Sequence, residues 1–227
     1  MITNITVVIP TLNSSKTLED TLSNISKLVQ NIIIVDANSN DKTIKIGKKY
    51  NSKIILSIPN RGQQLHVGAM KCTTDWILFL HSDSILSKNA HKEIKRFISF
   101  KSNKAGYFKL KFSEKNTYAL IIEKIVYLRN VILKLPYGDQ GLLISKSLYQ
   151  NVGGFKPLPI MEDVNINLRI GYNNIKQINS YIITDSIKYK KYGWIKRPFF
   201  NLKCLILYFL KFDINKIYKE YYNDKQN

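Results

Sequence analysis

The sequence has few cysteines, prolines and glycines and no long apolar run, and each shortage excludes a class of protein. The two cysteines, Cys72 and Cys204, lie far apart, which argues against a disulfide framework and favours a reducing compartment. Ten glycines and six prolines in 227 residues exclude collagen-like and low-complexity chains. The longest apolar run, 204–210, is well short of the roughly 20 residues that span a membrane. Because no signal-like segment opens the chain, we expect a cytoplasmic protein.

Acidic residues are also scarce, with 16 Asp and Glu against 35 Lys and Arg, and the formal net charge is +19. Such an excess attracts polyanions, whether nucleic acid, anionic lipid or phosphorylated small molecules. Only five of the basic residues are arginine, the residue that reads DNA bases best, so we expect no nucleic-acid partner. A compositional bias toward lysine explains the charge equally well.

Continuous β-branched runs alternate with amphipathic segments through the first 85 residues. The pattern predicts strands at 5–9, 32–35, 53–57 and 76–80, and helices at 17–29, 42–49 and 64–72. This alternation is typical of an α/β fold with a mostly parallel central sheet and helices on both faces. Such sheets bind ligands at the carboxyl ends of their strands.

The second half of the chain is less regular. We expect a strand at 107–112, an apolar helix at 118–133, a loop at 137–141, a strand at 142–144 and a helix at 161–170. After residue 188 the chain becomes basic, and an apolar helix begins near Pro198. The sequence therefore predicts a single domain at 1–190, followed by a basic and amphipathic helical segment at 191–227.

Polar residues follow the predicted strands at the ligand-binding edge of the sheet. Asp36 directly follows a buried strand, where it would accept hydrogen bonds from a ribose hydroxyl or a base edge, or else cap the next helix. Arg61 stands at a loop-to-helix junction and offers a planar fork for phosphate, the alternative being a solvated surface arginine. Gly62 beside it permits close backbone approach.

Two acidic motifs suggest chemistry. In His81-Ser82-Asp83, Asp83 would hold a divalent cation against phosphate oxygens, whereas the alternative is a cap for a helix starting near Lys88. Glu162-Asp163 opens a predicted helix and provides a general base, or simply complements the helix dipole. The chain contains no Gly-x-Ser-x-Gly, Gly-x-Gly-x-x-Gly or P-loop motif.

Taken together, these motifs resemble the family 2 glycosyltransferases, which have the GT-A fold. The resemblance covers about residues 5–170 and, within the family, looks like a small bacterial subfamily. It is carried by five ordered segments: Val7–Asn13, Ile33–Thr43, Asn60–Gly62, Phe79–Asp83, and Gly138–Gly141 with Gly153–Asp163. It implies a nucleotide-binding half at about 1–100 and an acceptor half at about 101–190.

The resemblance implies inverting transfer of a hexosyl-type sugar from a nucleotide-diphosphate donor, with a UDP-sugar expected, to a hydroxyl acceptor. Asp163 would be the base, with Glu162 as the competing assignment, and Asp139 and Gln140 would line the acceptor side. Asp83 and His81 would hold Mg²⁺ or Mn²⁺. The donor-binding residues would be Pro10, Thr11, Asn13, Asp36, Asn38, Arg61, Gln64, Ser82 and Asp83.

The chain departs from the family pattern at three points. Ser14 replaces an acid after Pro-x-x-Asn, and His81 replaces the first acid of an Asp-x-Asp pair. No clear Gln-x-x-Arg-Trp is present, which disfavours a processive polysaccharide synthase. Two other classes remain as alternatives: a nucleotidyltransferase, which lacks its expected Gly-rich loop, and a non-catalytic basic module that binds RNA or membrane.

The C-terminal segment predicts contact with an anionic membrane. The apolar run from Pro198 is too short to span a bilayer and is preceded by a basic collar of Lys190, Lys191, Lys196 and Arg197. We expect peripheral attachment to the inner face of the cell membrane and a lipid-linked acceptor. The alternative is that this helix packs on the sheet or on a second subunit in a homodimer.

Overall fold

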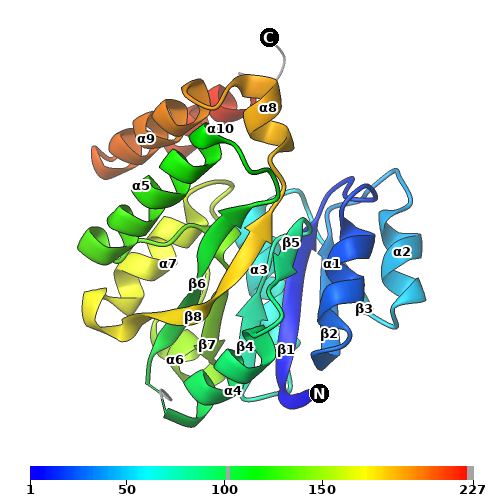
Figure 1. Ribbon diagram of the computed structural model, residues 1–227. Helices are drawn as coiled ribbons and strands as arrows, with labels where there is room; N and C mark the ends of the chain where they lie inside the picture. The colour runs from blue at the N-terminus through cyan, green and yellow to red at the C-terminus, as the bar shows by residue number, and fades with distance from the viewer. Residues whose placement is uncertain (101–102, 224–227) are drawn as a thin grey trace.

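The computed structural model describes residues 1–100 and 103–223, which form one curled sheet with helices around it (Figure 1). The strands are β1 (Ile2–Thr11), β2 (Val29–Asp36), β3 (Lys53–Leu56), β4 (Trp76–Phe79), β5 (Ser84–Leu86), β6 (Ala105–Phe112), β7 (Leu142–Ser145) and β8 (Ile175–Thr184). Their order across the sheet is β3-β2-β1-β4-β7-β6-β8-β5. Within the described residues most strand pairs are parallel, which confirms the predicted α/β class.

Helices cover both faces of this sheet. They are α1 (Leu18–Ile25), α2 (Thr43–Lys49), α3 (Arg61–Met70), α4 (Ala90–Phe100), α5 (Thr117–Leu133), α6 (Lys146–Asn151), α7 (Glu162–Ile170), α8 (Ile187–Tyr192), α9 (Lys196–Phe209) and α10 (Ile214–Asn223). One core cluster joins the sheet to α1, α4 and α5, and a second joins it to α3, α6 and α7. The chain therefore has the predicted layered architecture in a single domain.

The first four strands of the chain pair in parallel, as the sequence predicts. β1 lies between β2 and β4, and β3 pairs with β2, all in parallel. Buried β-branched side chains fill both faces of β1 and β2, as in a sheet covered on two sides. Thr11 stands opposite Asp36 at the carboxyl ends of these two strands. The loops that carry the predicted donor residues therefore meet at one edge of the sheet.

Among the elements that the sequence pattern does not predict are β5 in the first half of the chain and α6 and β8 in the second. β8 alternates buried isoleucines with polar residues and pairs in parallel with β6. β5 pairs with β8 in the antiparallel sense directly after Asp83. The alternative reading of Asp83 as a helix cap is therefore wrong, because β5 separates it from α4, which begins at Ala90.

The C-terminal segment forms two helices where one was expected, and residues 224–227 of the predicted segment lie outside the described residues. α9 and α10 are joined by a turn at Lys211, which has a left-handed φ of 58°. A third core cluster packs Cys204 and Leu205 of α9 and Ile217 of α10 against Met161 and Val164. The inner face of this helix pair is therefore part of the folded domain and contacts the beginning of α7.

The predicted basic collar does not form a uniform exposed ring. Arg197 is buried, and its side chain lines the same pocket as Asp83 and Asp163. Lys190 lies 2.5 Å from a carboxylate oxygen of Glu114, whereas Lys191 and Lys196 are exposed. Arg197 therefore belongs to the pocket and not to the collar.

Candidate active site

A pocket opens beyond the end of β4, where the C-terminal helices pack over the start of α7. Its walls come from the start of α3, the loop after β4, η1 (Gly138–Gln140), the start of α7, the end of β8 and the helices α8, α9 and α10. The predicted residues Arg61, His81, Asp83, Asp139, Glu162 and Asp163 all line it. Arg61 and Asp163, which lie far apart in the sequence, are thus gathered in one cavity.

Asp36 lies beneath the donor edge and is fully buried. Its Oδ2 accepts hydrogen bonds from the Thr11 hydroxyl at 2.7 Å and the Ser39 hydroxyl at 2.6 Å, and its Oδ1 accepts from the Ser39 amide at 2.7 Å. These bonds hold the loops after β1 and β2 together. In this structure Asp36 therefore braces the donor edge, and its contact with a nucleoside stays a prediction.

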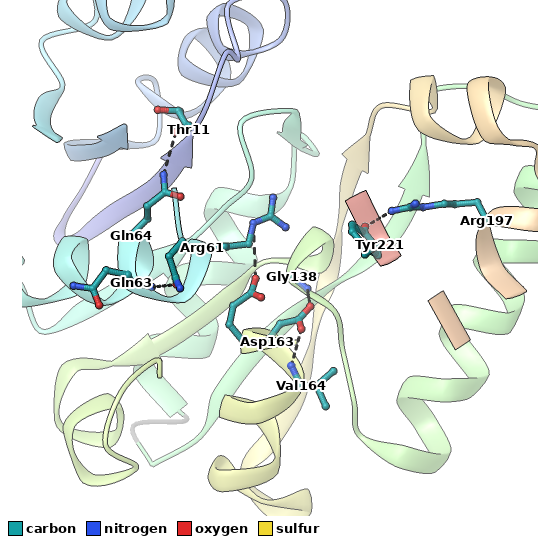
Figure 2. Close-up of polar contacts among 11 residues, drawn as sticks. Thr11, Arg61, Gln63, Gln64, Gly138, Asp163, Val164, Arg197 and Tyr221 are labelled. Carbon is teal, nitrogen blue, oxygen red and sulfur yellow. Dashed lines mark hydrogen bonds and ion pairs between the residues drawn. The ribbon is translucent and has the colours of Figure 1, made fainter. Parts of the chain in front are cut away.

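Gln64 adds a second brace to the same edge. Its Nε2 donates to the carbonyl oxygens of Thr11 at 3.0 Å and Val35 at 2.8 Å, and the side chain is buried. Figure 2 shows Gln64 reaching from α3 to Thr11. Pro10 is likewise buried within β1, opposite Val35.

Two exposed asparagines complete this edge. Asn13 and Asn38 both have left-handed backbones, with φ of 50° and 60°, which asparagine tolerates better than most residues. Asn13 Oδ1 accepts from the amide of Asn40 at 3.0 Å and so connects the two loops. Of the residues predicted to bind the donor nucleotide at this edge, Asn13 and Asn38 have exposed side chains, which a nucleoside could contact directly.

Arg61 and Glu162 lie side by side in the pocket wall. Arg61 Nε lies 3.8 Å from Glu162 Oε1, and the arginine side chain is 39% exposed whereas the glutamate side chain is 5% exposed. Burial raises the pKa of Glu162 to about 8, the charge of Asp163 adds to this rise, and Arg61 opposes it. The arginine therefore remains accessible to an anion while the glutamate is held inside.

Gly62 serves packing between two segments of the chain. A Cβ added there would lie 2.0 Å from the carbonyl oxygen of Lys156, and the Gly62 amide donates to the carbonyl of Leu158 at 3.0 Å. The close approach that the sequence predicted is thus made by the loop before α7. This contact places the Arg61 end of α3 beside Glu162.

Asp83 follows β4 at the pocket wall, and its carboxylate has an unusual environment. Its Oδ1 atom is buried and accepts no hydrogen bond from any described residue. Ser82 beside it is engaged with the donor edge, donating from its hydroxyl to Ser14 Oγ at 3.0 Å. Of the motif His81–Asp83, Asp83 is therefore the member with an oxygen left for a ligand.

The residues present suit a divalent cation held jointly with phosphate. Among residues 1–100 and 103–223, no three His, Cys, Asp or Glu side chains gather as a complete metal cluster. Mg²⁺, however, commonly takes only one or two protein carboxylates together with water and substrate phosphates. The unsatisfied buried oxygen of Asp83 fits such a partial site, and His81 lines the same cavity.

Asp163 is oriented by two backbone amides at the beginning of α7. Its Oδ2 accepts from Gly138 at 2.7 Å and its Oδ1 from Val164 at 2.7 Å (Figure 2). A Cβ added to Gly138 would lie 2.8 Å from His81 Nε2 and 3.5 Å from Asp163 Oδ2. Glycine at this position therefore lets the imidazole, the loop and the carboxylate pack closely.

Gln140 is turned away from the pocket and is fully buried. Its Oε1 accepts from Arg129 at 3.0 Å and Asn130 at 2.9 Å, and its Nε2 donates to the carbonyl of Phe108 at 3.0 Å. These bonds fix η1 against α5 and β6. Of the two residues predicted for the acceptor side, Asp139 lines the pocket, whereas Gln140 supports the loop that carries it.

The C-terminal half contributes residues to the pocket that the sequence pattern does not predict. Thr184 and Asp185 enter from the end of β8, Tyr189 from α8, Arg197 from α9 and Tyr221 from α10. The only available signal was the rarity of arginine, which makes Arg197 unusual in a lysine-rich segment.

Residues 6–136 match the family described as Glycosyl transferase family 2, more than half of the chain, and the protein therefore belongs to this family. An uncharacterized glycosyltransferase of Rickettsia conorii is 28% identical over 92 residues, which cover 40% of this chain and 32% of that relative. The match thus spans about a third of the length of such curated relatives.

Solved structures share the fold over most of the chain. Residues 1–349 of Staphylococcus aureus TarS, a poly(ribitol-phosphate) beta-N-acetylglucosaminyltransferase, give a TM-score of 0.63 at 19% identity, covering 90% of this chain and 65% of that one. Glucosyl-3-phosphoglycerate synthase from Mycobacterium tuberculosis, in complex with Mn²⁺ and UDP-glucose, gives 0.57 at 19% identity, covering 78% and 69%. These similarities confirm the predicted GT-A fold.

Proposed function

We propose that the protein transfers a sugar from a nucleotide-diphosphate sugar to a hydroxyl acceptor with inversion at the anomeric carbon. The observation that carries this proposal is the meeting of Arg61, Asp83 and Asp163 in one pocket at the carboxyl ends of the sheet. A cation and a metal-binding carboxylate suit a diphosphate leaving group, and a second carboxylate suits an acceptor hydroxyl.

The donor would lie along the edge that Asp36 and Gln64 brace. Thr11, Asn13 and Asn38 would surround the nucleoside, and Arg61 would contact the diphosphate through its exposed guanidinium. Asp83, with His81 beside it, would hold Mg²⁺ or Mn²⁺, which supplies charge neutralisation to the departing diphosphate. Since TarS has been crystallised with UDP-GlcNAc and the mycobacterial synthase with UDP-glucose, UDP is our expected nucleotide.

Asp163 is the better candidate for the base. Burial raises the pKa of Glu162 to about 8, so its protonated form predominates at neutral pH, whereas a base must be ionised. Asp163 is fixed by the amides of Gly138 and Val164, with oxygen lone pairs left for an acceptor hydroxyl. A base that takes the acceptor proton while the diphosphate leaves on the opposite side produces inversion in one displacement.

The first test is a screen of nucleotide sugars with and without Mg²⁺ or Mn²⁺, read by thermal stabilisation and by release of nucleoside diphosphate. Asp83→Asn should keep the fold but lose most metal-dependent affinity for UDP, whereas His81→Ala should have a milder effect. Wild-type turnover that persists in excess chelator would remove the metal from the proposal. Release of pyrophosphate from a nucleoside triphosphate would instead indicate a nucleotidyltransferase.

The second test separates the two acids of α7. Asp163→Asn should lower turnover by roughly 100-fold or more while leaving UDP affinity nearly unchanged, because the base acts on the acceptor. Glu162→Gln should retain turnover near neutral pH, since glutamine imitates the protonated acid. An inactive Glu162→Gln together with an active Asp163→Asn would reverse the assignment.

We further propose that the acceptor is lipid-linked and that the protein binds the surface of an anionic membrane. Apolar side chains are exposed along one face of α5 and one face of α9: Tyr118, Ile121, Ile125, Leu128 and Ile132, and Phe199, Leu202, Ile206 and Phe209. Figure 1 draws both helices at the end of the molecule away from α2. Among the described residues, no helix is both long and apolar enough to cross a bilayer.

Charge supports this choice of partner, since the net charge is +19 and exposed Lys196, Lys203 and Lys211 accompany the apolar face of α9. The intact protein should float with anionic vesicles, and less so at high salt, because salt screens the lysines. Phe199→Ser with Phe209→Ser, both exposed, should reduce flotation and leave the melting temperature unchanged. Dimerisation lost in the same variant, with no flotation of the wild type, would assign the face to a second subunit instead.

A further inference from the structure

Arg197 is a buried arginine in the wall of the pocket, and the proposed function does not use it. It is the second residue of α9 and is only 4% exposed. Its side chain lines the same cavity as Asp83 and Asp163. An arginine in this position is unusual, because arginine is almost never fully buried unless it is paired.

The protein supplies Arg197 with few partners. Its Nη2 donates a hydrogen bond to the hydroxyl of Tyr221, and this is the one hydrogen bond of the Arg197 side chain to a described residue. No carboxylate of residues 1–100 or 103–223 lies within ion-pair distance of the guanidinium. A buried guanidinium carries five N–H donors, so its other nitrogens have no protein acceptor in the described part of the chain.

Aromatic rings hold this cation in place. The guanidinium carbon lies 4.3 Å from the ring centre of Tyr221, 5.9 Å from that of Tyr192 and 6.0 Å from that of Phe200. Cation–π contacts stabilise the charge and fix its position, but they leave the N–H edge of the fork available. The arrangement resembles a binding group that is preorganised for an anion from outside the protein.

The position of Arg197 indicates whether the anion belongs to the donor or to the acceptor. Figure 2 shows Arg197 reaching toward Tyr221 on one side of Gly138 and Asp163, whereas Thr11 and Gln64 lie on the other side. The braced donor edge belongs to that other side, with Arg61 between it and Asp163. A molecule that presents a hydroxyl to Asp163 from the α9 side would therefore extend toward Arg197.

We propose that Arg197 is the anion subsite of the acceptor, which therefore carries a phosphate or carboxylate group beside the hydroxyl that receives the sugar. A guanidinium binds either group through two parallel hydrogen bonds. The inference rests on the proposed function, because it takes Asp163 as the base and the sheet edge as the donor site. It deepens that function by naming the chemical class of the acceptor.

The test measures binding to the protein in saturating UDP and Mg²⁺ by calorimetry. The probes are glycerol 3-phosphate, glycerate and glycerol, which share a hydroxylated three-carbon skeleton and differ in charge. We expect wild type to bind one of the two anions at least tenfold more tightly than glycerol, and the preferred anion identifies the group. Arg197→Gln should abolish this preference, whereas Arg96→Gln, which removes an exposed arginine from α4, should retain it.

Three outcomes would overturn the proposal. One is equal affinity of the wild type for all three probes, a comparison that needs no variant and therefore stands even if Arg197→Gln fails to fold. Another is an unchanged preference in a folded Arg197→Gln. The third is a loss of UDP affinity in Arg197→Gln as large as its loss of anion affinity, which would assign Arg197 to the donor diphosphate. A wild type that binds no nucleotide sugar of the screen would refute the proposed function itself, and so the two failures are distinguishable.

Discussion

The free energy of unfolding of Glu162→Gln, relative to that of the wild type, should increase as the pH rises. Glu162 is 4% exposed, and its pKa is raised from 4.5 to about 8, first by burial and then by the charge of Asp163. Between these two values the folded state keeps a proton that the unfolded state releases. Stability from the protonated acid is therefore complete below pH 4.5 and is lost as the pH rises to about 8.

The size of this effect follows from the pKa difference. Each pH unit between 4.5 and 8 costs the wild type about 1.4 kcal/mol of unfolding free energy, or about 5 kcal/mol in all as an upper value. Glutamine cannot ionise, so the variant escapes this loss. Glu162→Gln also alters the 3.8 Å contact between Arg61 Nε and the Glu162 carboxylate. The difference in unfolding free energy between variant and wild type at low pH measures the effect of that contact.

Urea titrations followed by circular dichroism at pH 5, 6, 7 and 8 would measure the difference. The stability of Glu162→Gln relative to wild type should increase steadily over this range. Glu93→Gln, on α4 and outside the pocket, is the matched control and should show no such trend. A difference between Glu162→Gln and wild type that stays constant from pH 5 to pH 8 would refute the reasoning, because it would mean that Glu162 ionises alike in both states.

Three further substitutions test the packing around the site. Gly138→Ala brings a Cβ 2.8 Å from His81 Nε2 and should lower turnover at least tenfold with UDP affinity retained; unchanged kinetics would show that the loop tolerates the methyl. Gly62→Ala, whose Cβ would lie 2.0 Å from the Lys156 carbonyl, should cost about 1–3 kcal/mol in urea unfolding. Asp36→Asn places a donor against the Thr11 and Ser39 hydroxyls and should cost about 1–3 kcal/mol and weaken UDP binding, whereas wild-type values in both assays would contradict its bracing role.

The sequence was informative where local pattern and tertiary environment agree. The runs Ile5–Ile9 and Ile32–Val35 are continuous β-branched segments, and both form strands buried on two faces. The strand at 175–184 was missed because its isoleucines are separated by Lys, Gln, Asn and Ser, and its parallel partner β6 precedes it by about 60 residues. No local signal records a pairing of that kind.

The candidate site shows the same division at the level of single residues. Arg61, Asp83 and Asp163 were found because each stands beside a recognisable strand end or helix start, and all three reach the pocket. Gln140 was assigned to the acceptor side from its place in Gly138–Gly141, although its amide is buried against α5 and β6. Neighbouring positions in a tight loop face opposite ways, and only the fold shows which of them faces the cavity.

The sequence by itself therefore determined the family, the α/β class and the acids and arginine at the strand ends, because these depend on short-range pattern and spacing. The tertiary structure decided which side chains are braces and which are open to a ligand, since burial and hydrogen bonding depend on segments far away in the chain. Arg197 is the clearest case. Its sequence context of lysines and aromatics predicts a surface charge, but the packing of α9 and α10 on α7 encloses it in the pocket wall.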